Sequence, residues 1–414
     1  MSPCSRPTSL NRRGTPEVKT LTEAMDWLLA QSGPPPQAQR IPIASALGRI
    51  LAETIHSPLA VPAFDNAQMD GFAVRSGEIQ SGTVLPVSQR IPAGAVAEPL
   101  LPQTAARVFT GAPMPAGADA VVMQEDTEIL ADGQVRFHQS TDVGQFVRFA
   151  GGDLQVGQVV LPAGRRLSAA DVGLLASIGL AELSVYRTLR VGVFSSGNEL
   201  RQPGEPLGEG QIYDSNRPMI MSLVRGMGLT VDDLGSLPDC FETTRRRMSE
   251  GGQQCDVLLT CGGVSVGEED HIKSAVTAEG TLDLWKIAIK PGKPFAFGRV
   301  GRAAFLGMPG NPVSAWVTFV LLVRPFLLKA SGQVDVSPRS VWVPAGFDKP
   351  TTDARQEFLR ASIDPSGYAV LHPRQNSQIL SSIAESEGLL EVPMNAPVAR
   401  GDRLRFFPFP MLLA

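Results

Sequence analysis

Residues 190–261 read RVGVFSSGNELRQPGEPLGEGQIYDSNRPMIMSLVRGMGLTVDDLGSLPDCFETTRRRMSEGGQQCDVLLTC, and they give the clearest indication of the fold class. Apolar runs typical of buried strands alternate in it with apolar residues at helical spacing. The strands are predicted at 191–194, 229–235 and 255–261, and the helices at 218–227 and 241–251. Such alternation is typical of an open parallel α/β sheet, which we predict for residues 188–330.

The rest of the chain divides into segments with different patterns. Residues 331–414 contain short strands separated by turns, which predicts a small C-terminal β-barrel domain. Residues 56–154 show short apolar runs divided by Pro and Gly, which predicts an inserted β-rich lobe. The flanking segments 17–55 and 155–187 then form a discontinuous helical and linker domain, and the polar residues 1–16 a disordered arm. The predicted fold class is therefore multidomain, α/β and β.

Local signals place several elements. Thr15 followed by Pro16 predicts the start of a helix over 16–30. Ser168 and Asp171 form a capping box, and Gly179 marks the end of that helix. The segment 41–53 is interpreted as a short strand and helix. The apolar run 315–323 is far shorter than the roughly 20 residues of a membrane span, so we interpret it as a buried helix and expect no membrane association.

Composition excludes other classes of protein. Lys and Arg number 37 and Asp and Glu 41 among 414 residues, a net charge of −4, and aromatic residues make up only 6%. Neither a basic surface nor a base-stacking platform is indicated, so no nucleic acid partner is expected. The four cysteines and four histidines show no metal-site spacing, which predicts free thiols in a reducing compartment. Without a signal peptide the expected location is the cytoplasm.

Polar loops follow the predicted strands. In an open parallel sheet, ligands bind at the carboxyl ends of the strands. The loops at this rim are expected at 195–199, 262–270, 290–294 and 309–314. Their backbone amides, hydroxyls and carboxylates suit a phosphate-bearing ligand with a divalent cation. Lys290 and Lys293 lie on a proline-flanked loop, where two adjacent cations predict a bound anion.

Several of these residues also have a purely structural interpretation. The glycine-rich run GGVSVG can be an ordinary tight turn. Asp270 can complement the dipole of the following helix instead of binding magnesium, and Asp214 can cap the helix near Arg217. Glu199 can be a solvated loop residue. The sequence alone leaves each of these alternatives open.

Seven motifs together carry a family resemblance. They are FDNAQMDGFAV (64–74), VFTGAPMPAGADAVVMQED (108–126), FSSGNEL (194–200), GQIYDSN (210–216), CGGVSVGEEDHIK (261–273), KIAIKPGKPFAFG (286–298) and MPGNPVSA (308–315). In this order they resemble the molybdopterin molybdenumtransferases of the MoeA type, whose relatives include the E domain of gephyrin. The resemblance covers the chain from about residue 17 and implies a molybdopterin-binding α/β domain. It also implies Mg²⁺-dependent insertion of molybdate into adenylylated molybdopterin, with release of AMP.

The resemblance further implies roles for individual residues. The implied catalytic residues are Asp70, Thr110, Glu199, Asp270, Lys290 and Lys293, of which Glu199 and Asp270 would hold the magnesium ion. The implied substrate-binding residues are Asp214, Gly262, Gly263, Ser265, Gly267, Pro294, Pro309, Gly310, Asn311, Pro312, Ser314, Arg360 and Ser377. A homodimer is implied whose active site is shared between subunits, so that the β-rich lobe acts on the partner. Molybdopterin adenylyltransferase and proteins of molybdoenzyme maturation are the implied partners.

The chain departs from the family motifs at several positions. Ala67, Gln68 and Phe72 replace Ser, Ala and Tyr of the family motif, which removes two hydroxyls near Asp70. Gly152 lies where the family has an arginine-rich segment. Asn198 replaces a carboxylate beside Glu199, and His271 stands where tyrosine is common. These changes keep open a scaffold or carrier that binds the pterin without turnover. A molybdopterin adenylyltransferase is a second alternative, although that enzyme is essentially the α/β domain alone, and tungstate remains an alternative oxyanion.

Overall fold

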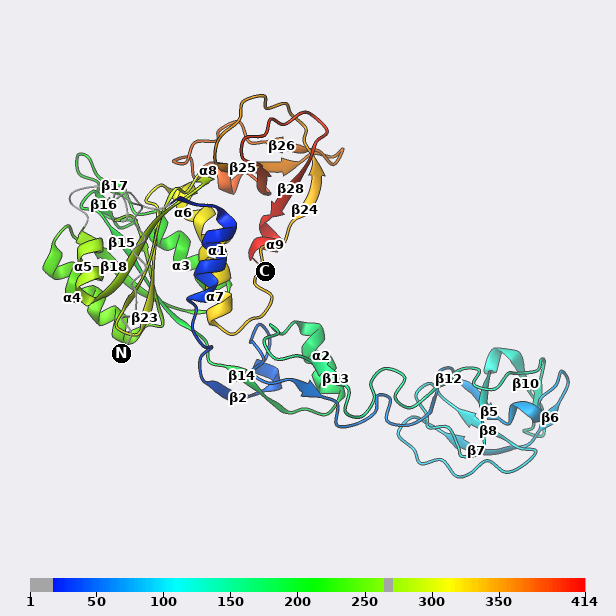
Figure 1. Cartoon of the computed structure of the whole chain (residues 1–414). Helices are drawn as coiled ribbons and strands as arrows, with labels where there is room; N and C mark the ends of the chain where they lie inside the picture. The colour runs from blue at the N-terminus through cyan, green and yellow to red at the C-terminus, as the bar shows by residue number, and fades with distance from the viewer. Residues whose placement is uncertain (1–17, 264–270, 414) are drawn as a thin grey trace, which may run out of the picture.

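A computed structural model describes residues 18–263 and 271–413 of the chain. The molecule is elongated (Figure 1), with an α/β body and a C-terminal sheet at one end and a β-rich lobe at the other. The multidomain fold class of α/β and β parts is confirmed. The arm expected at 1–16 lies outside the described residues, and the exact domain boundaries stay a prediction.

The α/β body is built on a seven-stranded sheet in the order β1-β20-β22-β23-β19-β15-β18. The strands are β1 Val18–Lys19, β15 Arg190–Ser196, β18 Thr230–Leu237, β19 Val257–Cys261, β20 Gly280–Ile287, β22 Pro294–Val300 and β23 Ala303–Met308. Strands β18, β15, β19 and β23 are mutually parallel, as expected. The sheet is nevertheless mixed, since β22 pairs antiparallel with both β20 and β23. The short links between these strands leave no room for the crossover that parallel pairing needs.

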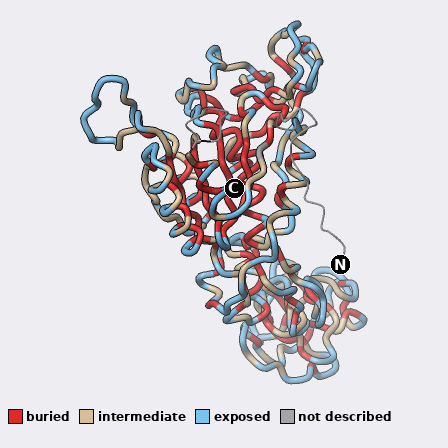
Figure 2. Tube along the Cα trace, turned by 60° about the vertical axis from the view of Figure 1, so that its left-hand side comes forward, coloured by how far each residue is buried: buried red, intermediate tan, exposed pale blue. Residues whose placement is uncertain are grey.

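Helices cover both faces of this sheet. Figure 2 shows buried residues concentrated in the interior of the molecule. The helical elements are α1 Leu21–Ala30, α3 Asn216–Gly226, α4 Phe241–Gln254, α5 His271–Glu279, α6 Pro312–Thr318, a π-helical turn Phe319–Val323 and α7 Arg324–Ala330. One apolar cluster joins the sheet to α1, α3, α6 and α7, and a second joins it to α4 and α5. The body is therefore a three-layer sandwich whose strand ends remain free to form a site.

Two expectations about helices need correction. The first helix is capped by Thr20, whose hydroxyl accepts from the Glu23 amide in a full capping box, and not by Thr15. This helix packs against α7 in the body, not with the discontinuous domain. Within the described residues, the 19-residue helix Pro312–Ala330 is long enough to span a membrane, and an 18-residue window of it has mean hydropathy 1.6. It is a core helix, because 94% of its apolar window is buried inside the protein.

A small domain links the body to the lobe. It contains the antiparallel pairs β2 Ala38–Pro42 with β14 Glu182–Tyr186, and β3 Ile55–His56 with β13 Val159–Leu161, together with α2 Ala169–Ser177. The Ser168 and Asp171 capping box is confirmed, and Gly179 follows α2 with φ +80°. The helix expected within 41–53 is only a 3-10 turn at Ile43–Ser45. Residues from both chain segments share one apolar cluster, so the two pieces form one unit.

The lobe is made entirely of short strands and turns. Its four-stranded sheet has the order β7 Val87–Ile91, β8 Ala105–Val108, β5 Gly71–Val74 and β9 Ala120–Met123. Smaller sheets pair β10 Thr127–Ile129 with β11 Val135–Phe137 and β6 Val84–Leu85, and β12 Val147–Arg148 with β4 Asn66–Ala67. Two further 3-10 turns lie at Ser76–Glu78 and Gln124–Asp126. Figure 1 shows this lobe well separated from the body.

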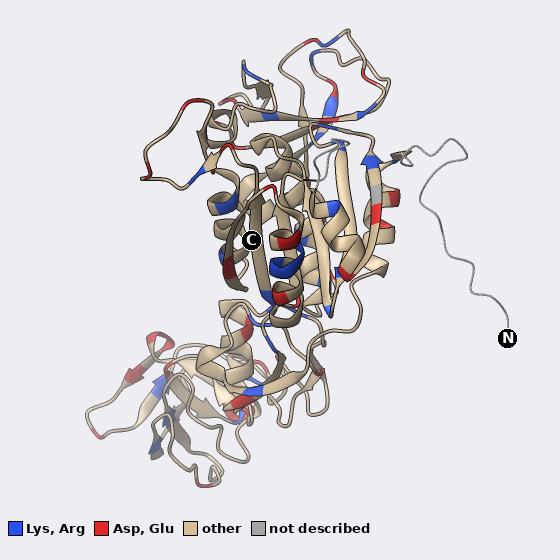
Figure 3. Cartoon of the chain, turned by 90° about the vertical axis from the view of Figure 1, so that its left-hand side faces the viewer, with Lys and Arg blue, Asp and Glu red and all other residues tan. Residues whose placement is uncertain are grey.

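The C-terminal strands form one sheet in the order β21-β25-β27-β28-β24, with β26 also on β25. These are β21 Ile289–Lys290, β24 Val341–Pro344, β25 Gln356–Ile363, β26 Ala369–Leu371, β27 Gly388–Val392 and β28 Arg403–Pro408, with short helices α8 Ser381–Ala384 and α9 Phe409–Leu413. A single bridge between Ala345 and Ala369 connects the β24 and β26 ends. The expected strands are confirmed, while closure into a barrel stays a prediction. Figure 3 shows charges of both signs interspersed over the whole molecule, in keeping with the small net charge.

Candidate functional site

A cavity of about 1010 Å³ lies between the strand ends of the body and the C-terminal sheet. The structure brings many of the predicted site residues to its wall. They are Glu199, Lys290, Lys293, Pro294, Pro309, Gly310, Asn311, Ser314, Arg360 and Ser377. The remaining lining comes largely from residues 347–377 of the C-terminal segment. Three of the four expected rim loops, 195–199, 290–294 and 309–314, thus contribute to the wall, and the C-terminal sheet closes the cavity over them.

Backbone pairing explains why these segments meet. Strand β21 leaves the β20–β22 hairpin and pairs in parallel with β25, with Lys290 opposite Glu357. The Val313 amide donates to the Ser377 carbonyl at 3.1 Å, which joins the start of α6 to the C-terminal segment. Hydrogen bonds therefore connect the segments that carry the 290–294 and 309–314 loops to the C-terminal segment.

The two predicted lysines have different surroundings. Lys290 Nζ lies 3.0 Å from a Glu357 oxygen and 3.1 Å from an Asp353 oxygen, and the hydrogen bond to Glu357 raises the pKa of this lysine. Lys293 is exposed, and its ammonium has no partner among the residues the structure describes. The argument that both cations need an external anion is therefore corrected: carboxylates of the protein neutralise Lys290, and Lys293 is left available.

Arg360 is the largest fully buried side chain, with 0% exposure, although a strand arginine would ordinarily be expected at the surface. Its guanidinium donates to the Ser382 hydroxyl at 3.2 Å and to three backbone carbonyls at 3.5 Å. Burial lowers its pKa to about 10. In the described part of the chain no carboxylate pairs with it, so a buried positive charge stands in the cavity wall. Such a charge attracts an anion strongly because little solvent screens it.

The expected magnesium ligands are only partly described. Glu199 lies at the cavity, whereas Asp270 lies outside the described residues, as do Ser265 and Gly267. No group of three His, Cys, Asp or Glu side chains able to hold a metal ion occurs within 18–263 and 271–413. Glu199 is thus the single expected ligand available there, and the described residues alone do not fit a complete magnesium site.

The first two glycines of the GGVSVG run have a clear backbone role. Gly262 and Gly263 adopt φ of +89° and +66°, where L side chains are strained. A Cβ on Gly263 would meet the Ile272 Cδ1 atom at 2.4 Å. The Gly262 amide donates to the Met308 carbonyl at 3.1 Å, which places this turn beside the Pro309–Gly310 turn. These glycines shape the rim without lining the cavity.

Two other implied site residues, Asp214 and Pro312, and the departure Asn198 also lie away from the cavity lining. Asp214 is buried, pairs with the Arg217 guanidinium at 3.0 Å and accepts from the Arg217 amide at 3.1 Å at the start of α3. This geometry favours its structural interpretation as a cap. Pro312 is the first residue of α6, where its missing N–H is tolerated. Asn198, a departure from the family, accepts a 3.3 Å hydrogen bond from the Asp239 amide.

Asp70 and Thr110 form a pair in the lobe, far from the cavity of the same chain (Figure 1). The Thr110 amide and hydroxyl donate to one Asp70 oxygen at 2.7 and 2.8 Å. The backbone hydrogen bond from Thr110 lowers the pKa of Asp70. Phe72, which replaces a tyrosine of the family, is buried in the lobe core. The lost hydroxyls therefore do not leave Asp70 without donors.

Sequence reasoning missed four charged residues around the cavity: Lys349, Asp353, Arg355 and Glu357. Lys349 Nζ lies 2.5 Å from a Glu357 oxygen, and Arg355 makes two 2.9 Å hydrogen bonds to Asp353. No spacing rule could have placed them at the site, because the pairing of β21 with β25 brings Lys290 to this segment. The only available signal was a cluster of charges within KPTTDARQEFLR (349–360).

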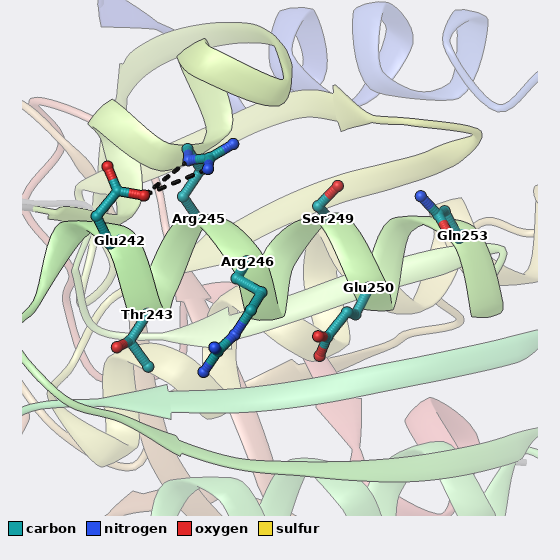
Figure 4. A pocket seen from close by; sticks show the side chains of 7 residues that line it. All are labelled: Glu242, Thr243, Arg245, Arg246, Ser249, Glu250 and Gln253. Atoms are coloured by element: carbon teal, nitrogen blue, oxygen red, sulfur yellow. Dashed lines mark hydrogen bonds and ion pairs between the residues drawn. The ribbon is translucent and has the colours of Figure 1, made fainter.

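A second depression, of about 350 Å³, lies along α4 (Figure 4). All its lining side chains come from one exposed helix face, and Arg245 pairs there with Glu242 and, at 2.7 Å, with Glu279. Arg245 is thus already paired, and none of the lining residues belongs to the predicted site. We therefore take the larger cavity as the functional site.

Three family models match successive segments that together cover most of the chain. The MoeA N-terminal region, domains I and II, matches residues 19–179. A probable molybdopterin-binding domain matches 192–329, and the MoeA C-terminal region, domain IV, matches 343–409. The cavity therefore lies between the segments matched by the second and third of these models.

Individual relatives agree with these matches. A molybdopterin molybdenumtransferase of Haemophilus influenzae is 44% identical over 76% of this chain and 78% of its own length. Molybdopterin molybdenumtransferase 2 of Mycobacterium tuberculosis is 36% identical over 88% of this chain and 93% of its own length. The crystal structure of the molybdopterin biosynthesis MoeA protein of Pyrococcus horikoshii has a TM-score of 0.82 at 29% identity, covering 95% of this chain and 100% of that one.

Proposed function

Since the chain belongs to the molybdopterin molybdenumtransferase family, we propose that it inserts molybdate into molybdopterin, a step of molybdenum cofactor biosynthesis, in the cavity between body and C-terminal sheet. The observation that carries the proposal is the unmatched positive charge of Lys293 and Arg360 at this cavity. Molybdate is a small dianion, and such a cation pair stabilises it where solvent is partly excluded.

The finer chemistry rests on the same wall. We propose adenylylated molybdopterin as the pterin substrate and AMP as the released product. Lys293 and Arg360 would balance the oxyanion charge, while the Ser314 and Ser377 hydroxyls can donate hydrogen bonds to oxyanion oxygens. Lys290, which its carboxylate partners hold in one position, would contribute geometry as well as charge.

Magnesium dependence is part of the proposal, although the described residues alone do not complete a site. Among the described residues, Glu199 is the expected magnesium ligand that lines the cavity. A titration of AMP release against Mg²⁺ after chelation tests this. AMP release that chelation leaves unchanged would remove magnesium from the reaction.

We also propose a homodimer in which Asp70 and Thr110 act on the partner's cavity. The support is their place in a lobe remote from the cavity of their own chain. Mixing an Asp70→Ala protein with a Lys293→Ala protein should restore part of the activity, because mixed dimers would contain one intact site. Either variant mixed with itself is the control. Failure of complementation in confirmed mixed dimers contradicts the shared site.

The central experiment supplies purified protein with adenylylated molybdopterin, Mg²⁺ and either molybdate or tungstate. AMP release and activation of an apo-molybdoenzyme are measured together. We expect both with molybdate, and the tungstate arm determines metal choice. Lys293→Ala should lose most activity, whereas Lys329→Met, which removes an exposed charge at the end of α7, should retain it. Tight pterin binding without either signal would instead indicate a carrier or scaffold.

The proposal also includes a cellular setting. A cytoplasmic location fits a cofactor synthesis step that exchanges substrates with other enzymes. Molybdopterin adenylyltransferase would supply the substrate, and proteins of molybdoenzyme maturation would receive the product. Fractionation and co-purification from cells test both statements.

A further inference from the structure

We propose that Lys349 is a further anion-binding residue of this cavity and that Glu357 positions it there. The ligand would be a tetrahedral dianion, either the oxometalate itself or the phosphate group of the pterin substrate. The inference rests on the proposed function for the identity of these anions. It assigns a role to a residue of the C-terminal segment that no motif singled out.

The geometry places two lysines on one carboxylate. Glu357 is 3% exposed, with Lys290 Nζ 3.0 Å from its Oε1 atom and Lys349 Nζ 2.5 Å from its Oε2 atom. Lys290 comes from the body and Lys349 from the C-terminal segment, and both line the cavity. A single buried carboxylate therefore brings ammonium groups from two parts of the chain to one wall.

The hydrogen-bond donors of these lysines are not used up. An ammonium group has three N–H donors. Lys349 donates to the Thr351 carbonyl at 2.7 Å and faces Glu357, and Lys290 faces Asp353 and Glu357. Among the described residues each lysine thus has two partners, which leaves one donor on each for a ligand.

The charges of the cluster are also unequal. Lys290, Lys349 and Arg355 are the cations, and Asp353 and Glu357 are the carboxylates that contact them. One lysine would suffice to neutralise Glu357, and Arg355 already matches Asp353 with two hydrogen bonds. The second lysine is therefore in excess for stability alone, and an excess cation at a cavity wall attracts an anion.

Lys349 is suitably placed for this role because its side chain is 19% exposed. It is held firmly enough to lose little conformational freedom on binding, yet it can reach a ligand in the cavity. Asp348, its neighbour, is also in the lining, but one of its oxygens accepts the Arg400 amide at 2.9 Å. That carboxylate is thus partly engaged elsewhere.

The test measures binding without turnover. Isothermal titration calorimetry of the full chain uses sodium molybdate alone and inorganic phosphate alone, on wild type, Lys349→Met, Lys349→Arg and the control Lys329→Met. We expect Lys349→Met to weaken the binding of one of the two anions about tenfold, which is the effect of losing one charge-assisted hydrogen bond. Lys349→Arg should restore most of the affinity, and Lys329→Met should match wild type. The anion that responds identifies the source of the dianion.

The outcomes separate this inference from the proposed function. If wild type turns over and Lys349→Met leaves both anion affinities unchanged, the role of Lys349 is overturned and the proposed function stays intact. Weakened binding in a protein that shows no turnover would support the role of Lys349 and contradict the function. Wild type that binds neither anion overturns both.

A measurement on wild type covers the case in which Lys349→Met does not fold. Limited acetylation followed by mass spectrometry compares Lys349 with Lys329, with and without the anion that binds. Protection of Lys349 alone is the expected result. Equal modification of Lys349 in both conditions would overturn the inference.

Discussion

Replacing Arg360 by methionine should make the free protein more stable and the anion site weaker. The arginine is fully buried, yet its partners within the described chain are a hydroxyl and backbone carbonyls, not a carboxylate. Methionine retains much of the apolar stem without the charge. A buried ion that lacks a partner is unfavourable for folding, so its removal should be favourable.

The magnitude follows from the titration of this group. Burial lowers the pKa of Arg360 well below its usual value, to about 10. Holding the charge in the folded state thus costs about 1–3 kcal/mol after allowance for screening by solvent in the cavity. Loss of the long hydrogen bonds offsets part of this gain. We expect a rise in Tm of about 1–4 °C, as a chain of this length changes by a few degrees per kcal/mol.

The assay is differential scanning calorimetry of wild type and Arg360→Met, with and without molybdate, together with the dependence of AMP release on molybdate concentration. Molybdate should raise the Tm of wild type more than that of the variant. The KM for molybdate should rise at least about tenfold in the variant. A lower Tm combined with an unchanged KM would refute the reasoning and make Arg360 a purely structural residue.

Three further predictions concern groups beside or away from the cavity. Asp353→Asn should lower Tm at neutral pH, because the hydrogen bonds from Arg355 lower the pKa of Asp353 and stabilise the folded protein. The difference in Tm from wild type should shrink as the pH falls below about 4, since the stabilisation is lost as Asp353 protonates. A Tm profile from pH 3 to 8 checks this. Gly263→Ala should destabilise the chain by about 2–4 kcal/mol through left-handed backbone strain and a clash at 2.4 Å, measured by urea unfolding, and equal stability would contradict the described turn. Asp214→Asn should lower stability by up to about 3 kcal/mol through its ion pair with Arg217 and leave the KM for substrates nearly unchanged, whereas a raised KM at unchanged Tm would indicate direct substrate binding.

Local pattern was enough for most of the body. The strands and helices between 190 and 261 alternate as expected, since buried parallel strands are continuous apolar runs and the helices are amphipathic. The capping box at Ser168 was equally readable because both partners lie within one turn. The first helix shows the limit: Thr15 and Thr20 both suit an N-cap, and only Thr20 has a Glu three residues later.

The rim loops could be predicted because topology alone brings them together. Parallel strands end at one edge, so the 290–294 and 309–314 loops had to be neighbours. The neutralisation of the Lys290 charge could not be predicted in the same way. The partners of Lys290 lie 63 and 67 residues away in the chain, and pairing between two sheets places them.

The burial of Arg360 could not be predicted for a different reason. Along β25, residues 357–361 are all buried, so the alternation that separates inward from outward positions is absent. An arginine in such a strand gives no sign of its burial until the neighbours on both faces are known. Its charge could be assigned to an anion from the family resemblance, but its lack of a carboxylate partner required the structure.

The position of β21 links the two features that the sequence did not predict, namely the partners of Lys290 and the burial of Arg360. This short strand leaves the body and joins the C-terminal sheet. The register that sets Lys290 against Glu357 therefore also holds the lysine loop at the cavity that Arg360 lines. A change in the packing of the two sheets would move Lys290 relative to Lys293, although neither residue lies in the C-terminal segment. The electrostatics of the cavity thus depend on contacts between segments that local sequence patterns treat as independent.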